Sequence, residues 1–197
     1  MFLLDIIGLI SFTISGFIKS LNKNLDILGI INISIITAVG GGVIRDLLTN
    51  NKPFTFSSYY PLSIALITVF ILLLFFKNIK DNSFYFNFSD AIGLSVFSLT
   101  GTLIGIENNY NVFGIIFLGT ITAVGGGIIR DILINEVPNI FRNDFYASIA
   151  IIISIITFMA NYFEILNELV SYLIIVFGVS LRFVALKYNW RIPKIQS

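Results

Sequence analysis

Apolar residues in this chain gather into seven long runs separated by short polar segments. A membrane-spanning helix needs about 20 mainly apolar residues, and in lipid only helices and closed barrels satisfy every backbone group. Ile, Leu and Phe occupy every phase of these runs, so the alternating pattern of a barrel strand is missing. The sequence therefore predicts an all-α membrane protein with seven transmembrane helices. The predicted spans are Phe2–Ile18, Ile27–Leu48, Tyr60–Phe76, Ala91–Ile106, Val112–Ile134, Phe145–Phe163 and Leu169–Leu186.

The basic residues of the loops predict the orientation. With the N-terminus outside, eight basic residues fall on the cytoplasmic side and only Lys52 falls outside, which matches the usual enrichment of Lys and Arg in cytoplasmic loops. The first run carries Asp5 at its start and Lys19 at its end, the reverse of a signal peptide. We therefore expect a retained first span in a multi-pass protein of the cell (plasma or inner) membrane, with a cytoplasmic C-terminus. The eight basic residues are Lys19, Lys23, Lys77, Lys80, Arg142, Lys187, Arg191 and Lys194.

The amino-acid composition excludes several classes of function. The chain has 56% hydrophobic and 12% charged residues, with neither Cys nor His. Thiol nucleophiles, imidazole bases and the usual zinc sites are therefore ruled out, and a net charge of +1 gives no footprint for nucleic acid. Any function rests on carboxylates, arginines, hydroxyls and backbone groups. No cofactor motif accompanies them, so we expect neither an enzyme nor a bound cofactor or metal.

The chain contains an internal repeat. ITAVGGGVIRD at Ile36–Asp46 recurs as ITAVGGGIIRD at Ile121–Asp131, which sets the repeat offset at 121 − 36 = 85. From Asp5 to Phe56, 24 of 52 positions are identical to their counterparts at this offset, which indicates a duplication. Each copy holds three spans, so the second copy enters from the opposite side and the two form an inverted repeat. We expect a first repeat at 1–85, an inverted repeat at 86–166, and a seventh helix with a cytoplasmic tail at 167–197.

A glycine triplet lies within the second and the fifth predicted helix. The triplets are Gly40–Gly42 and Gly125–Gly127, and each Gly costs a helix about 1 kcal/mol relative to Ala. One interpretation is close packing through small residues. The other is a broken helix that borders water, as in transporter folds with paired broken helices. Because the triplets occupy symmetric positions, we expect helices two and five to be broken there.

An Arg-Asp pair follows each triplet, as Arg45-Asp46 and Arg130-Asp131. These residues either reach the membrane interface or form charge pairs inside the protein. Adjacent helical residues point about 100° apart, so each pair needs other partners. The predicted topology supplies them, and we expect cross-helix pairs Asp5–Arg45 and Asp90–Arg130.

Two phenylalanines lie between glycines on the first and fourth predicted helices. Phe12 is flanked by Gly8 and Gly16, and Phe97 by Gly93 and Gly101. Close helix packing is the simpler interpretation of this spacing. The alternative places Phe12 or Phe97 at a hydrophobic constriction that gates a pore.

The motifs resemble one known family. GGGVIRD and GGGIIRD, duplicated in a chain of seven spans, resemble the prokaryotic TRIC (trimeric intracellular cation) channels, a family also described as possible glycine transporters. The tail, with Arg182, Ala185, Trp190 and Pro193, is similar to the C-terminal pattern of that family. The resemblance implies a homotrimer in the lipid membrane, with a potassium-conducting pore in each protomer lined by helices two and five.

The resemblance and the residues together give a predicted ion pathway. Glycine carbonyls, carboxylates and threonine hydroxyls replace hydration water around a permeant K⁺ or Na⁺, while the arginines fix the helices. The rival function is a secondary transporter of a small zwitterion such as glycine, which inverted repeats suit equally well. The predicted pathway residues are Thr37, Gly40, Gly41, Gly42, Asp46, Thr122, Gly125, Gly126, Gly127 and Asp131.

Overall fold

The computed structural model describes residues 2–21, 23–75, 83–142 and 145–190, and every regular element in these residues is a helix. The all-α fold class is therefore confirmed for the described residues. The helices are α1 (Phe2–Leu21), α2 (Ile27–Leu48), α3 (Phe54–Ser57), α4 (Tyr60–Phe75), α5 (Ser83–Glu107), α6 (Val112–Leu133), α7 (Asn139–Arg142), α8 (Tyr146–Tyr162) and α9 (Glu168–Lys187).

The helix lengths support most of the predicted spans. By length and composition α1, α2, α5, α6 and α9 can cross a membrane. The shorter apolar helices α4 and α8 have 16 and 17 residues, so the count of seven spans stays a prediction. α5 begins at Ser83, well before the predicted Ala91, because its first two turns carry polar residues that conceal the helix.

Some sequence expectations concern residues that the structure does not describe. They are the last residue of the predicted third span, Phe76, the basic residues Lys77, Lys80, Arg191 and Lys194, and Pro193 of the tail motif.

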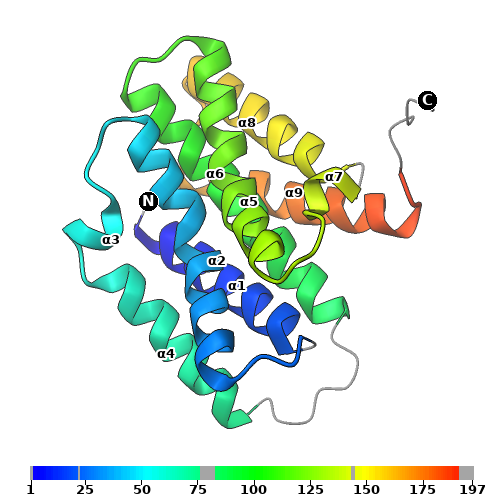
Figure 1. Ribbon diagram of the computed structural model, residues 1–197. Helices are drawn as coiled ribbons and strands as arrows, with labels where there is room; N and C mark the ends of the chain where they lie inside the picture. The colour runs from blue at the N-terminus through cyan, green and yellow to red at the C-terminus, as the bar shows by residue number, and fades with distance from the viewer. Residues whose placement is uncertain (1, 22, 76–82, 143–144, 191–197) are drawn as a thin grey trace, which may run out of the picture.

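The helices form two similar groups. α1 packs against α2 and α4, and α5 packs in the same way against α6 and α8. The groups meet where α1 contacts α5 and where α2 contacts α6. α9 lies on α5 and α8, at the opposite edge of the molecule from α4 (Figure 1). Most of α5 is buried and only a minor part of α9 is, so the core lies along α1, α5 and the α2–α6 crossing.

Local sequence signals set the ends of α2 and α6. The side chains of Asp26 and Asn111 each accept the backbone N–H three residues on, at 2.7 and 2.8 Å, and so cap the two helix starts. Beyond the helix ends, Asn50 and Asn135 take positive φ angles of 55° and 56°, a conformation that Asn tolerates. Both pairs are separated by the repeat offset, so the repeat extends to the caps.

The predicted breaks at the glycine triplets are wrong. α2 runs from Ile27 to Leu48 and α6 from Val112 to Leu133 without interruption. The triplets instead allow the two helices to cross closely. A Cβ atom at Gly41 would overlap the carbonyl oxygen of Thr122, and one at Gly126 would overlap that of Thr37. Packing at this crossing offsets the low helix propensity of glycine, and the close-packing interpretation holds.

Candidate functional site

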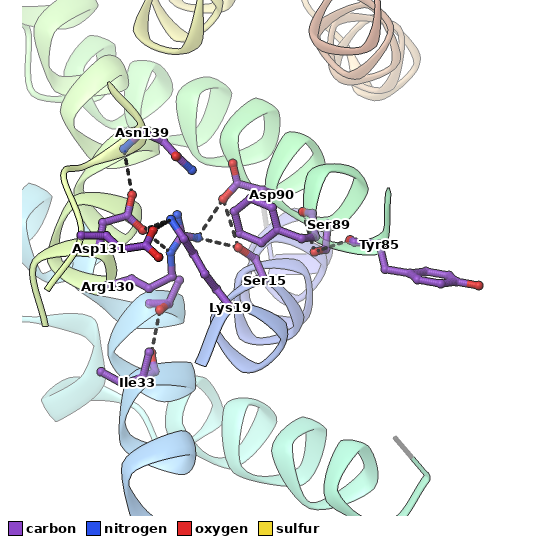
Figure 2. A network of polar contacts seen from close by, with 12 residues as sticks. Ser15, Lys19, Ile33, Tyr85, Ser89, Asp90, Arg130, Asp131 and Asn139 are labelled. Carbon is purple, nitrogen blue, oxygen red and sulfur yellow. Dashed lines mark hydrogen bonds and ion pairs between the residues drawn. The ribbon is translucent and has the colours of Figure 1, made fainter. Parts of the chain in front are cut away.

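A charge network surrounds Arg130 at the end of α6 (Figure 2). The Arg130 side chain is fully buried. Its Nη1 donates to Asp90 Oδ1 at 2.9 Å and to Ser15 Oγ at 2.6 Å, and Ser15 Oγ donates to Asp90 Oδ1 at 3.0 Å. The predicted Asp90–Arg130 pair is confirmed. This network joins α1, α5 and α6, and a buried guanidinium is tolerated here because it is paired.

Two lysines, one at the end of α1 and one in the turn after it, extend this network to the loop after α6. Lys19 Nζ lies 2.6 Å from Asp131 Oδ1 and 3.1 Å from Glu136 Oε2, and Lys23 Nζ lies 2.5 Å from Glu136 Oε1. Burial alone would raise the pKa of Glu136, but hydrogen bonds from Lys23 and Lys19 outweigh it and lower that pKa below 4.5. Glu136 is therefore ionised at neutral pH, and α1 is held to the loop after α6.

Aromatic rings lie beside the guanidinium groups in and near the network. Arg130 Nη2 is buried and has no hydrogen-bond partner among the residues that the structure describes. The guanidinium of Arg130 lies 5.0 Å from the ring centre of Phe86, and that of Arg182 lies 4.9 Å from the ring centre of Tyr146. Arg182 of the tail motif therefore links α9 to α8 through a cation–π contact.

A related charge network lies at the end of α2, at the equivalent position of the first repeat. Arg45 places Nε and Nη2 each 2.8 Å from Asp46 Oδ1, and its guanidinium lies 5.4 Å from the ring centre of Phe54. The expected Asp5–Arg45 pair is wrong, because no ion pair within 4.0 Å joins these described residues. The half-buried Asp5 instead accepts a long hydrogen bond of 3.5 Å from Tyr60 Oη.

The difference between Asp5 and Asp90 has a physical reason. Asp5 lies in the first turn of α1 and is half-buried, whereas Asp90 is the eighth residue of α5 and is 1% exposed. Water competes for the carboxylate at the first position. At the second it is excluded, so the carboxylate must pair with the arginine.

The two Arg-Asp pairs also bind internally, which the sequence argument discounted. Arg45 binds Asp46, and Arg130 Nε donates to Asp131 Oδ1 at 2.8 Å. The long arginine side chain spans the angle between neighbouring positions. Each aspartate also has a partner that was not predicted, since the second oxygens of Asp46 and Asp131 accept the backbone N–H of Phe54 and Asn139 at 2.7 and 2.8 Å.

Several of the predicted pathway residues meet at the α2–α6 crossing, whereas Asp46 and Asp131 lie in the charge networks at the helix ends. Thr37 and Thr122 are fully buried, and their hydroxyls donate to the carbonyls of Ile33 and Leu118 at 2.6 Å. Each hydroxyl oxygen keeps lone pairs after donating its proton. Gly40–Gly42 and Gly125–Gly127 are also buried. The crossing therefore gathers oxygen atoms but leaves no room between the helices in this conformation.

The two phenylalanines meet in the α1–α5 interface. The ring centres of Phe12 and Phe97 are 5.3 Å apart, and both side chains are buried. A Cβ at Gly93 would overlap the Phe12 ring, and one at Gly8 would lie 2.9 Å from Phe97 Cζ. Each ring fills the space beside a glycine of the other helix, as the packing interpretation requires.

Sequence reasoning missed the roles of Ser15, Lys19 and Glu136. In the sequence Ser15 is one of many hydroxyl residues, and Lys19 is one of eight basic residues assigned to the cytoplasmic side. Ser15 and Lys19 are four residues apart and therefore share one face of α1. Their counterparts in the repeat are Thr100 and Ile104, and that of Glu136 is Asn51, so the departures from the repeat were the available signal.

The polar groups of the site are of the kinds that interact with ions. In the part of the chain that the structure describes, no group of three or more carboxylates is placed to hold a metal ion. The two networks and the crossing between them present carboxylates, carbonyls and hydroxyls to the interior of a helical membrane bundle. Such groups within membrane spans mark ion pathways or bundle-interior pairs.

Comparisons with known proteins agree on one family. A family model described as glycine transporter matches residues 2–77 and 87–162. The UPF0126 membrane protein YvgT of Bacillus subtilis is 33% identical over 97% of this chain and 94% of its own length. The UPF0126 inner membrane protein YadS of Escherichia coli is 32% identical over 96% of this chain and 93% of its own length.

Solved structures cover the whole fold. A chain from work on conductance through TRIC cation channels is 34% identical, with a TM-score of 0.86 over 100% of this chain and 98% of that one. The TRIC trimeric intracellular cation channel orthologue from Rhodobacter sphaeroides is 28% identical, with a TM-score of 0.89 over 96% of this chain and 98% of that one.

Proposed function

We propose a function that starts from the family of the protein. This chain belongs to the TRIC channel family, and the family model that matches it carries the description glycine transporter. The resemblance found in the motifs is thereby confirmed. We infer that the protein is a monovalent cation channel that conducts potassium. The likeness over full length to a chain studied for conductance through TRIC cation channels carries this proposal.

The proposed pathway runs inside the protomer between the two charge networks. Its ends are the outer Arg45-Asp46 and inner Arg130-Asp131 pairs, and its middle is the α2–α6 crossing with the two glycine triplets. We place these ends outside and inside on the strength of the loop charges. The half-buried Asp5 adds negative charge at the outer end, which raises the local concentration of cations there.

Conduction requires the crossing to open. Gly41 and Gly126 now lie against the carbonyls of Thr122 and Thr37, so no hydrated ion fits between the helices. When α2 and α6 separate, these carbonyl oxygens and the threonine hydroxyls become free to replace hydration water around an ion. Cation ligation thus needs no broken helix. Phe12 and Phe97 line the adjoining α1–α5 interface, and in this scheme a gating role for them remains a proposal.

The arginines fix the helices that line the pathway and do not bind the permeant ion. Arg45 and Arg130 each neutralise the aspartate that follows it. A guanidinium only donates hydrogen bonds, so it repels a cation and stabilises a carboxylate. We infer that they fix the ends of α2 and α6 and limit the negative charge along the route.

We further propose a homotrimer with one pore in each protomer. The Rhodobacter sphaeroides relative is a trimeric intracellular cation channel orthologue, and exposed Leu, Ile and Phe side chains of α4 and α9 suit lipid or protomer contacts. Light scattering in detergent should then give three times the protomer mass of 22.0 kDa; a monomer mass would contradict the assembly.

The proposal is tested by planar-bilayer recording of the purified protein. Under a KCl gradient we expect single-channel currents whose reversal potential lies toward the potassium equilibrium potential, because the pathway presents oxygen ligands and net negative charge. Sodium chloride tests the second cation. Reversal toward the chloride potential, or no current in any salt, would contradict a cation channel.

The rival transporter is separated in proteoliposomes. A glycine carrier would give saturable glycine uptake that stops without a gradient of a coupled ion, and no unitary currents. We expect potassium currents and no concentrative glycine uptake.

A further inference from the structure

Helix α9 follows both copies of the repeat and contacts the second copy, through α5 and α8. Arg182 lies on this helix and is 3% exposed. Its guanidinium lies 4.9 Å from the ring centre of Tyr146, the first residue of α8. A cation is attracted to the face of an aromatic ring, most strongly where water is excluded. This buried contact therefore joins the additional helix to the second repeat.

Tyr146 extends from α9 to the charge network around Arg130. Its side chain is 2% exposed. A Cβ atom at Gly127 would lie 3.3 Å from Tyr146 Oη and 3.5 Å from Arg130 Nη2, so the hydroxyl and the guanidinium border the same point of α6. The charges of Asp90, Arg130 and Arg182 all act on this hydroxyl. The four side chains therefore form one buried electrostatic cluster that includes a residue of α9.

The first repeat has a tyrosine in a similar place but a different neighbour on its ring. Tyr60 is the first residue of α4, and its Oη donates to Asp5 Oδ2 at 3.5 Å. The Tyr60 ring packs edge-on against Phe2, with ring centres 5.0 Å apart. α4 also lies at the opposite edge of the molecule from α9 (Figure 1). In the described part of the chain, the contact with an arginine from outside the repeat is therefore particular to the second copy.

The contact fixes where the Tyr146 hydroxyl lies. With the ring held by Arg182, the hydroxyl stays beside Gly127 and Arg130 on α6. We propose that Arg182 is a positioning residue of the channel: by holding the Tyr146 ring, it keeps the Arg130 network and the end of α6 in the arrangement that closes the α2–α6 crossing. α9 thus controls a pathway that it does not line.

This inference deepens the proposed channel function and rests on it for the effect on conduction. Arg182→Gln removes the cation from the Tyr146 ring. In planar-bilayer recording in KCl at a fixed voltage, we expect this variant to raise the open probability at least about twofold. The unitary conductance should stay unchanged, because α9 does not line the pathway. Arg182→Lys keeps a cation for the ring and should restore the open probability toward that of the wild type.

Two further variants separate positioning from a merely structural role of α9. Tyr146→Phe keeps the ring for Arg182 but removes the hydroxyl beside Arg130, so it should also raise the open probability, and Arg182→Gln should add nothing in that background. The matched control is Trp190→Leu, which removes the other aromatic contact between these helix ends, Phe145–Trp190 at 5.1 Å. It should leave the open probability unchanged. An equal rise in Trp190→Leu would mean that loosening α9 is sufficient, and it overturns the proposal.

Thermal unfolding of the purified full-length protein tests the link to the network without currents. Arg182→Gln and Asp90→Asn should shift the melting temperature non-additively, by at least about 1 °C, because both change the charge of one buried cluster. Independent sites would give additive shifts. If Arg182→Gln fails to fold, Tyr146→Phe tests the same link in both assays.

The outcomes separate this role from the channel function. Additive melting shifts, or an unchanged open probability of Arg182→Gln in a conducting protein, overturn the proposal. Coupled melting shifts in a protein that carries no current support Arg182 as a positioning residue of the network and overturn the channel.

Discussion

The charged side chains in this membrane bundle differ in how much the fold depends on them. Arg130 is fully buried, and Asp90 and Asp131 balance its charge. Asp5 is half-buried and, among the described residues, accepts one long side-chain hydrogen bond, from Tyr60 Oη. Removing a partner from a buried pair leaves an uncompensated charge in a low-dielectric interior. Replacing the half-buried Asp5 leaves no such charge, because Arg45 keeps Asp46 as its partner. Asp5 and Asp90, although equivalent in the repeat, therefore contribute unequally to the stability of the fold.

We expect Asp90→Asn to lower the free energy of unfolding by about 3–5 kcal/mol, because Arg130 loses an ionised partner. Asp5→Asn should cost less than about 1 kcal/mol. Both are measured by denaturation in one detergent, without potassium so that ion binding does not contribute. Equal losses in the two variants would mean that burial does not set the cost.

For individual residues, the sequence predicted a charge pair correctly where the order and direction of the helices determine which side chains meet. The repeat offset and the predicted topology brought Asp90 to Arg130. The same argument failed for Asp5, because sequence does not report that Asp5 is only half-buried in the first turn of α1. The ion pair between Lys19 and Glu136 was not predicted, because it joins α1 to the loop after α6, which is distant in the sequence.

At the scale of helices, the α2–α6 crossing is the feature on which the proposed pathway depends. The first two glycines of each triplet face the partner helix, and the closest contacts are reciprocal: Gly41 with Thr122, and Gly126 with Thr37. The sequence located this place correctly. It did not reveal the conformation, because a glycine triplet fits a helix break and a tight crossing equally well until the neighbouring backbone is known.

Gly126→Ala should destabilise the protein by about 1–3 kcal/mol, since its methyl group would overlap the carbonyl of Thr37. Gly114→Ala in the same helix is the matched control. A Cβ there would lie 3.4 Å from Tyr110 Cβ and 3.5 Å from Asn111 Oδ1, which are ordinary contacts, and alanine favours the helix by about 1 kcal/mol. Thermal unfolding compares the two, and equal stability would show that the crossing is loose.

At the scale of the whole molecule, one three-helix plan is used twice. Caps, charge pairs and glycine contacts recur at the repeat offset, as in the N–H bonds of Phe54 to Asp46 and Asn139 to Asp131. The sequence predicted this plan well, because glycine, arginine, aspartate and proline mark specific backbone positions. The orientation in the membrane rests on loop charges alone and stays a prediction.

The absence of cysteine makes that orientation testable. We expect Asn108→Cys, exposed after α5, to react with a membrane-impermeant maleimide on intact cells. Lys187→Cys, exposed at the end of α9, should react only after permeabilisation. The chain without cysteine is the control for background labelling. The reverse pattern would place the N-terminus in the cytoplasm.

Asp46 binds in two directions at once. One carboxylate oxygen holds Arg45 on α2, and the other holds the first residue of the one-turn helix α3, Phe54. A force that moves α3 is therefore transmitted to the far end of α2, and from there to the glycine crossing. The short helix α3 is therefore mechanically coupled to the buried crossing. An antibody fragment that binds α3 would shift the opening of the crossing without entering the membrane.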